Sequence, residues 1–180
     1  MKREFVVFDL ETQRTFDEVG GYANTAKMGI SIGAAYDSRD DSIQVFREQQ
    51  LDALVELLFS APLVVGFNSF KFDYTVLQPY TDRRLHDLPG LDMLDSIYRI
   101  LGFRVSLDHL AAATLGRKKT GHGLDAIRWF RSGDWQKLEK YCTDDVLVTR
   151  DLYLFGCENG YVEFYDRRNR RMRRIEVNWA

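Results

Sequence analysis

The chain has 180 residues, of which 45% are hydrophobic and 29% are charged, and its formal net charge is −2. This length suits one domain with a well-formed core. The balance excludes a generally basic nucleic-acid coat, and no apolar run approaches the length of a membrane helix.

The first half of the chain reads mainly as strands. The strand patterns are Glu4–Asp9, Met28–Tyr36, Ser42–Arg47 and Leu63–Phe67. A polar turn joins the second pattern to the third, so the first three are expected to form a meander. Gln50–Phe59 has apolar residues at a helical period. We also expect Asn68 and Ser69 to cap a helix that begins near Lys71.

The second half reads mainly as helices. These are predicted over Leu91–Leu101, Leu107–Leu115 and about Trp135–Phe155, with a basic, glycine-rich loop over Gly116–Gly123. Strands followed by strand–helix alternation predict an α/β fold with a mixed sheet and helices on both faces. After Gly160 the alternation around a polar turn predicts a C-terminal β-hairpin.

The cysteine content and the N-terminal sequence indicate in which cellular compartment the protein is expected. Only two cysteines occur, Cys142 and Cys157, and both fall in a helical pattern. The charged start of the chain leads directly into a strand pattern, where a signal peptide would carry an apolar run. We therefore expect a cytoplasmic protein with reduced thiols.

Four acidic residues stand in apolar surroundings in three separate segments. They are Asp9, Glu11, Asp73 and Asp145. A carboxylate moved into such surroundings costs several kcal/mol or more unless it is paired, protonated or bound to metal. None of these segments offers Lys, Arg or His at a matching position. Hard oxygen ligands without sulfur or imidazole indicate Mg²⁺ or Mn²⁺ rather than zinc.

Periodicity predicts that these acids can converge. Asp9 and Glu11 are two residues apart on a strand, so they point to the same face. On the last long helix, Asp145 belongs to the apolar stripe and lies one turn after Tyr141. Asp144 instead shares a face with charged residues, so we expect a solvated carboxylate there.

The motifs Phe8-Asp9-Leu10-Glu11-Thr12, Asn68-x-x-x-Phe72-Asp73 and Tyr141-x-x-x-Asp145 occur in that order. They resemble the three exonuclease motifs of the DEDD superfamily of 3′–5′ exonucleases. Tyrosine in the third motif is typical of the tyrosine subgroup (DEDDy), since the histidine subgroup would have His at position 140, which is Lys. The chain is also similar to small, stand-alone RNase H-like members of this group.

This resemblance implies an RNase H-like five-stranded mixed sheet flanked by helices over residues 1–159, with a basic hairpin over 160–180 in the same domain. It implies two Mg²⁺ or Mn²⁺ ions, held by Asp9, Glu11 and Asp145, with Asp73 acting mainly through a bound water. Tyr141 would orient the attacking water, and the products would be nucleoside 5′-monophosphates.

Several residues are candidate contacts for nucleic acid, on DNA or RNA 3′ ends. Residues 160–180 hold six arginines against three acids, and a solvated charge run is the alternative explanation. The candidates are Asn68, Phe72, Lys118, Lys119, Arg168 and Arg171. Phe16 and Tyr22 could stack on bases or could pack in a small satellite core.

Other functions fit parts of this pattern. A catalytically silent nucleic-acid-binding accessory domain is the first alternative, although the presence of all four acids disfavours it. A phosphatase or nucleotidase on small phosphoesters is the second, and the order of the motifs disfavours it. No polymerase or helicase segment occurs in the chain, so a partner would have to supply such an activity.

Overall fold

The computed structural model describes residues 4–117 and 123–179. Its main sheet has five strands in the order β3-β2-β1-β4-β5. The strands are β1 (Val6–Thr12), β2 (Ile30–Asp37), β3 (Ser42–Arg47), β4 (Val64–Gly66) and β5 (Gly90–Asp92). β1 to β3 form the predicted antiparallel meander, and β4 and β5 continue the sheet in parallel. The predicted mixed five-stranded sheet is confirmed.

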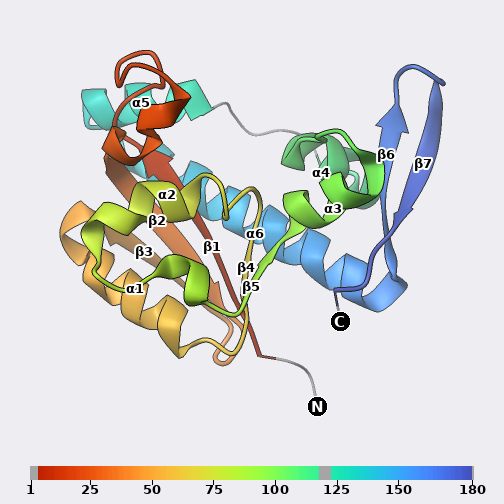
Figure 1. Cartoon of the computed structure of the whole chain (residues 1–180), viewed down its shortest axis with the longest axis horizontal. Coiled ribbons are helices and arrows are strands. Elements are labelled where there is room, and N and C mark those ends of the chain that lie inside the picture. The colour runs from red at the N-terminus through yellow and green to blue at the C-terminus, as the bar shows by residue number, and fades with distance from the viewer. Residues whose placement is uncertain (1–3, 118–122, 180) are drawn as a thin grey trace.

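Helices cover both faces of this sheet (Figure 1). They are α1 (Leu51–Ser60), α2 (Asp73–Leu77), α3 (Met93–Leu101), α4 (Leu107–Leu115), α5 (Gly123–Ser132) and α6 (Trp135–Asn159). Successive side chains of β1 point to opposite faces, so this central strand supplies two cores. Val6, Phe8 and Leu10 pack with α1 and α2, whereas Val7 packs with α6. None of the helices in the described ranges could span a membrane.

The C-terminal segment forms the predicted hairpin of β6 (Tyr161–Asp166) and β7 (Arg171–Glu176). Apolar side chains of both strands join the core cluster on the α6 side of the main sheet. Beyond β7, the indole Nε1 of Trp179 donates to Ser96 Oγ at 3.0 Å. The same indole packs against Gly156, where an added Cβ would lie 2.4 Å from the ring. Trp179 is thereby held between α3 and α6.

The predicted helix over Leu91–Leu101 is wrong at its start, because Gly90–Asp92 form β5 before α3 begins at Met93. A three-residue strand is too short to show a period of its own. The Asp92 carboxylate caps α3, accepting from the amides of Leu94 (2.9 Å) and Asp95 (3.2 Å). It also accepts from the amide of Phe70 at 3.0 Å. One buried carboxylate thus ties the end of β5 to the segment after β4.

The predicted capping by Asn68 and Ser69 is also wrong. α2 begins at Asp73, and Phe72 at its N-cap position makes no side-chain capping bond. Asn68 is in the left-handed region with φ of 67°, and its side-chain Oδ1 accepts from Arg104. The sequence did not predict α5, and residues 118–122 of the predicted basic loop lie outside the described residues.

Candidate metal centre

The site forms where β1 continues beyond its parallel neighbour. β4 pairs with β1 at Val6 and Val7, so within residues 4–117 and 123–179 no strand pairs with the second half of β1 on that side. Asp9 and Glu11 lie in this second half, in register with Ala34 and Ile32 of β2. Alternation places both carboxylates on the face that α6 covers, two and four residues after buried Val7.

Three carboxylates converge at this point. One oxygen each of Asp9, Glu11 and Asp145 lies within 4.8 Å of the others. Glu11 is buried, and the other two are half-buried. Within residues 4–117 and 123–179, no Lys, Arg or His forms an ion pair with Asp9 or Glu11. Like charges at this spacing repel, so the donor set fits a divalent cation that prefers oxygen ligands.

Asp73 adds a fourth carboxylate from the first residue of α2. Its side chain is only 3% exposed, and its Oδ1 is buried with no hydrogen-bond partner among the described residues. Asp73, Asp9, Glu11 and Asp145 line the same cavity of about 540 Å³. A buried acceptor without a donor is costly in a folded protein, and a metal-bound water would satisfy it.

The electrostatics of the cluster agree with this geometry. Burial raises the pKa of Asp9 well above its usual value, and the charges of Asp73, Glu11 and Asp145 raise it further. Burial also raises the pKa of Glu11 well above its usual value, and the charge of Asp145 raises it further. Burial also raises the pKa of Asp73 to about 7, although backbone amides oppose this rise. The folded protein therefore concentrates negative charge at this point, and bound cations or protons would neutralise it.

Tyr141 lies one helical turn before Asp145 on α6. Its ring packs edge-on against Trp129 of α5, with centroids 5.8 Å apart. Burial raises the pKa of Tyr141, and the charges of Asp145, Glu11 and Asp9 add to the rise. The phenol therefore keeps its proton at neutral pH and can donate a hydrogen bond, which suits an orienting group better than a base.

The helix register on α6 is as predicted. Asp145 belongs to the acidic cluster, whereas Asp144 does not. The carboxylate of Asp144 forms an ion pair with Lys140 Nζ at 2.6 Å, one turn earlier on the same helix. The two neighbouring acids therefore differ in role because they point to different sides of α6.

Aromatic side chains form one wall of the acidic cavity. Phe72 and Phe16 both line it, with ring centroids 5.9 Å apart. Tyr22 packs against Phe16 at 5.4 Å and is 60% exposed. Leu124 and Ile127 of the unpredicted α5 line the cavity as well. A helical spacing of apolar residues after Gly123 is the signal that would have predicted α5.

Three of the remaining predicted contacts, Asn68, Arg168 and Arg171, lie apart from the acids. Asn68 is bonded to Arg104 and does not line the acidic cavity. Arg168 and Arg171 lie on the hairpin, which Figure 1 shows on the other side of the molecule from α5. Lys118 and Lys119 lie outside the described residues.

A mixed sheet in this strand order, with two carboxylates on its central strand and a third beside them on α6, defines an RNase H-like protein. Proteins with this fold are typically metal-dependent nucleases. The chain belongs to the RNase H superfamily, since the model of that family matches residues 6–155. The matched range includes all four acids and Tyr141. No curated protein sequence matches the chain.

Proposed function

We propose that the protein is a divalent-metal-dependent 3′–5′ exonuclease of the DEDDy group that releases nucleoside 5′-monophosphates. The observation that carries the proposal is the convergence of Asp9, Glu11 and Asp145 beside a buried, partnerless oxygen of Asp73. The order of the three sequence motifs supports the exonuclease type.

In this proposal Asp9, Glu11 and Asp145 hold Mg²⁺ or Mn²⁺, two ions in all, and Asp73 contributes through a water. Such ions, when bound, lower the pKa of a water and stabilise the attacking and leaving oxygens of an in-line displacement. Tyr141 keeps its proton because of its raised pKa, and it orients the attacking water by a hydrogen bond.

The aromatic wall supports a nucleic-acid substrate. Phe16 is 36% exposed at the cavity, next to the more exposed Tyr22. Unpaired bases stack on such rings with little regard to sequence. Phe72 would contact the terminal nucleotide, and Asn68 would act on the neighbouring surface. A phosphatase that acts on small phosphoesters would not need exposed aromatic rings beside its metal site, because its substrate has no further bases to stack on them.

The other properties that we propose concern context. The protein is cytoplasmic, and its hairpin (160–180) belongs to the same domain as residues 1–159. The apolar side of the hairpin packs in the core of the main sheet, which supports one domain.

The test uses one oligonucleotide labelled at its 5′ end in one sample and at its 3′ end in another, with Mn²⁺, Mg²⁺ or EDTA. A 3′–5′ exonuclease releases the 3′ label at once as a mononucleotide, whereas the 5′-labelled strand shortens stepwise. EDTA should stop both reactions, and Asp9→Asn should be inactive. The matched control is Asp144→Asn, which removes a carboxylate outside the cluster.

Two outcomes would refute the proposal. Activity of Asp9→Asn close to that of the unchanged protein would remove the metal assignment. Strand binding without cleavage under every metal condition would favour the silent binding domain. DNA and RNA versions of the strand, run in parallel, determine whether the enzyme prefers deoxyribose or ribose. A contact to the 2′-hydroxyl would favour RNA.

A further inference from the structure

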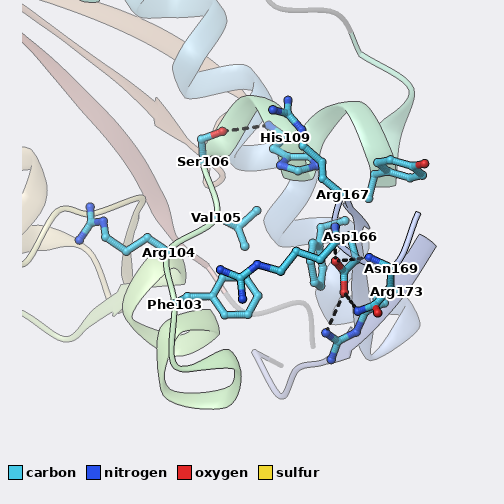
Figure 2. Close-up of a pocket in the computed structure, with 12 residues that line it drawn as sticks. Phe103, Arg104, Val105, Ser106, His109, Asp166, Arg167, Asn169 and Arg173 are labelled. Atoms are coloured by element: carbon cyan, nitrogen blue, oxygen red, sulfur yellow. Dashed lines mark hydrogen bonds and ion pairs between the residues drawn. The ribbon is translucent and has the colours of Figure 1, made fainter. Parts of the chain in front are cut away.

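A second and larger cavity lies between the hairpin and the segment that joins α3 to α4. Its volume is about 660 Å³, against about 540 Å³ for the acidic cavity. Figure 2 shows Phe103 and His109 on one wall, facing Arg167 and Asn169 of the hairpin. We refer to it as the hairpin cavity. The roles proposed for the acidic cluster do not use it.

The hairpin arginines differ in whether they are paired. Arg173 pairs with Asp166 at 3.3 Å, and Arg174 pairs with Glu163 at 3.1 Å. Arg167 and Arg168 line the hairpin cavity, and in the described part of the chain no acid forms an ion pair with either of them.

Asp166 is the acidic residue among those that line the hairpin cavity, and the turn already uses it. Its carboxylate accepts from Asn169 Nδ2 at 2.7 Å and from the backbone amide of Arg168 at 3.0 Å. These donors, with Arg173, lower its pKa to about 2. The carboxylate of Asp166 therefore stays charged, and its partner Arg173 balances that charge. Arg167 and Arg168 then leave the cavity with a net positive charge, which favours an anion.

The same cavity exposes aromatic rings on two sides. Phe103 is 45% exposed and Tyr165 is 41% exposed. The ring of Phe103 packs edge-on against buried Phe164, with centroids 6.0 Å apart, and this contact fixes its position. Free arginines together with exposed rings are the combination that binds single strands, because phosphates meet the charges and unpaired bases stack on the rings. Bases within a duplex are not available for such stacking.

A surface that carries basic, acidic and aromatic side chains leads from this cavity toward the metal centre. Arg104 lines the hairpin cavity and also a hollow whose other polar and aromatic lining residues are Asn68, Lys71, Asp92, Asp95 and Tyr98. The ammonium group of Lys71 lies 5.9 Å above the Tyr98 ring. Lys71 directly precedes Phe72, which lines the acidic cavity. Neighbouring residues thus connect the two cavities across one surface.

We propose that the hairpin cavity is a second binding site for single-stranded nucleic acid, which holds the part of the strand that lies 5′ of the end in the metal centre. Only the direction of the strand rests on the proposed nuclease function; the binding itself does not. Arg167 and Arg168 contact phosphates, and Phe103 and Tyr165 stack on bases.

The test measures binding by fluorescence anisotropy in EDTA, so that cleavage plays no part. The probe is a labelled single strand of about 16 nucleotides, a length that covers the upper range of such sites. Arg167→Gln with Arg168→Gln should raise the Kd about tenfold. It should also reduce the slope of log Kd against log salt by about 1.4, since each phosphate contact on a single strand contributes about 0.7.

A matched control removes the same charge from the same hairpin. Arg170→Asn with Arg174→Gln changes two arginines that do not line the cavity, and Asn tolerates the positive φ of 49° at position 170. Its Kd should change less than about twofold. Phe103→Leu keeps an apolar side chain but loses the stacking face, so it should weaken binding of the strand while leaving the salt slope unchanged.

Equal losses in the two double variants would overturn the proposal, because they would show that only net charge matters. If a nucleoside monophosphate bound as tightly as the single strand, the cavity would be reassigned to a small ligand. If a duplex bound more tightly than the single strand, base stacking on Phe103 and Tyr165 would be excluded. Failure of the nuclease proposal is distinguishable, since the protein would then bind the strand in EDTA as expected but degrade nothing with Mg²⁺ or Mn²⁺.

Discussion

Replacing Asp73 with Asn should stabilise the metal-free protein at alkaline pH and flatten the pH dependence of its stability. Burial raises the pKa of Asp73 from 3.8 to about 7. The folded protein therefore binds a proton in this window that the unfolded chain has already lost. The free energy of unfolding of the unchanged protein, without metal, must fall as pH rises from about 4 to about 7.

The pKa difference gives the size of the effect. Three units at about 1.4 kcal/mol each mean that charged Asp73 destabilises the fold by about 4 kcal/mol above pH 7. The side-chain amide of Asn would also be buried here without a hydrogen-bond partner of its own. This costs about 1–3 kcal/mol and offsets part of the stability gained by removing the charge. The net gain expected for Asp73→Asn is therefore about 1–3 kcal/mol at alkaline pH, and the gain should disappear below about pH 4.

Urea unfolding at several pH values in EDTA measures this directly. Asp144→Asn is the control, because that carboxylate is paired with Lys140 outside the cluster. Saturating Mg²⁺ or Mn²⁺ should stabilise the unchanged protein and do so less in Asp73→Asn, since ions that bind only the folded state raise its stability by mass action. A variant that is less stable than the unchanged protein at every pH would refute the reasoning, because it would show that Asp73 is satisfied without metal.

Further expected outcomes concern activity and packing. Asp145→Asn should abolish metal-dependent cleavage in a folded protein, whereas Asp144→Asn should remain close to the unchanged rate; the reverse result in an oligonucleotide assay would contradict the register of α6. Tyr141→Phe should bind metal and strand normally but cleave on the order of 10²-fold more slowly at saturating substrate, and an unchanged rate would leave the ring a packing role. Gly156→Ala places a methyl 2.4 Å from the Trp179 indole. Thermal or urea unfolding should show a loss of about 1–3 kcal/mol, and an unchanged stability would show that the C-terminal segment moves aside easily.

Local patterns were sufficient where a period fixes the direction of a side chain. Alternation on β1 placed Asp9 and Glu11 on one face, and the apolar stripe of α6 distinguished Asp145 from Asp144. Both predictions depend only on the repeat of one element, which is 2.0 residues for a strand and 3.6 for a helix. The helix predicted over Leu107–Leu115 from its own residues likewise matches α4.

Tertiary structure decided what depends on neighbours distant in sequence. Gly90–Asp92 became a strand because β4 pairs with it, although Leu91 and Asp92 suited the start of a helix. Asn68 does not cap the helix, because its side-chain oxygen accepts a hydrogen bond from Arg104 and its backbone amide donates to the carboxylate of Asp92. In each case a hydrogen-bond partner more than 20 positions away outweighed the local preference.

The sequence alone therefore determined the order of the motifs, the faces of β1 and α6 and the strand and helix content of most of the chain. Only the folded chain decided that four carboxylates share one cavity, that an oxygen of Asp73 has no described partner, and that Arg167 and Arg168 face Phe103 across a second cavity. The reason is physical. Periodicity within one element sets where a side chain points, but burial and charge–charge spacing depend on how separate elements pack, which no local pattern contains.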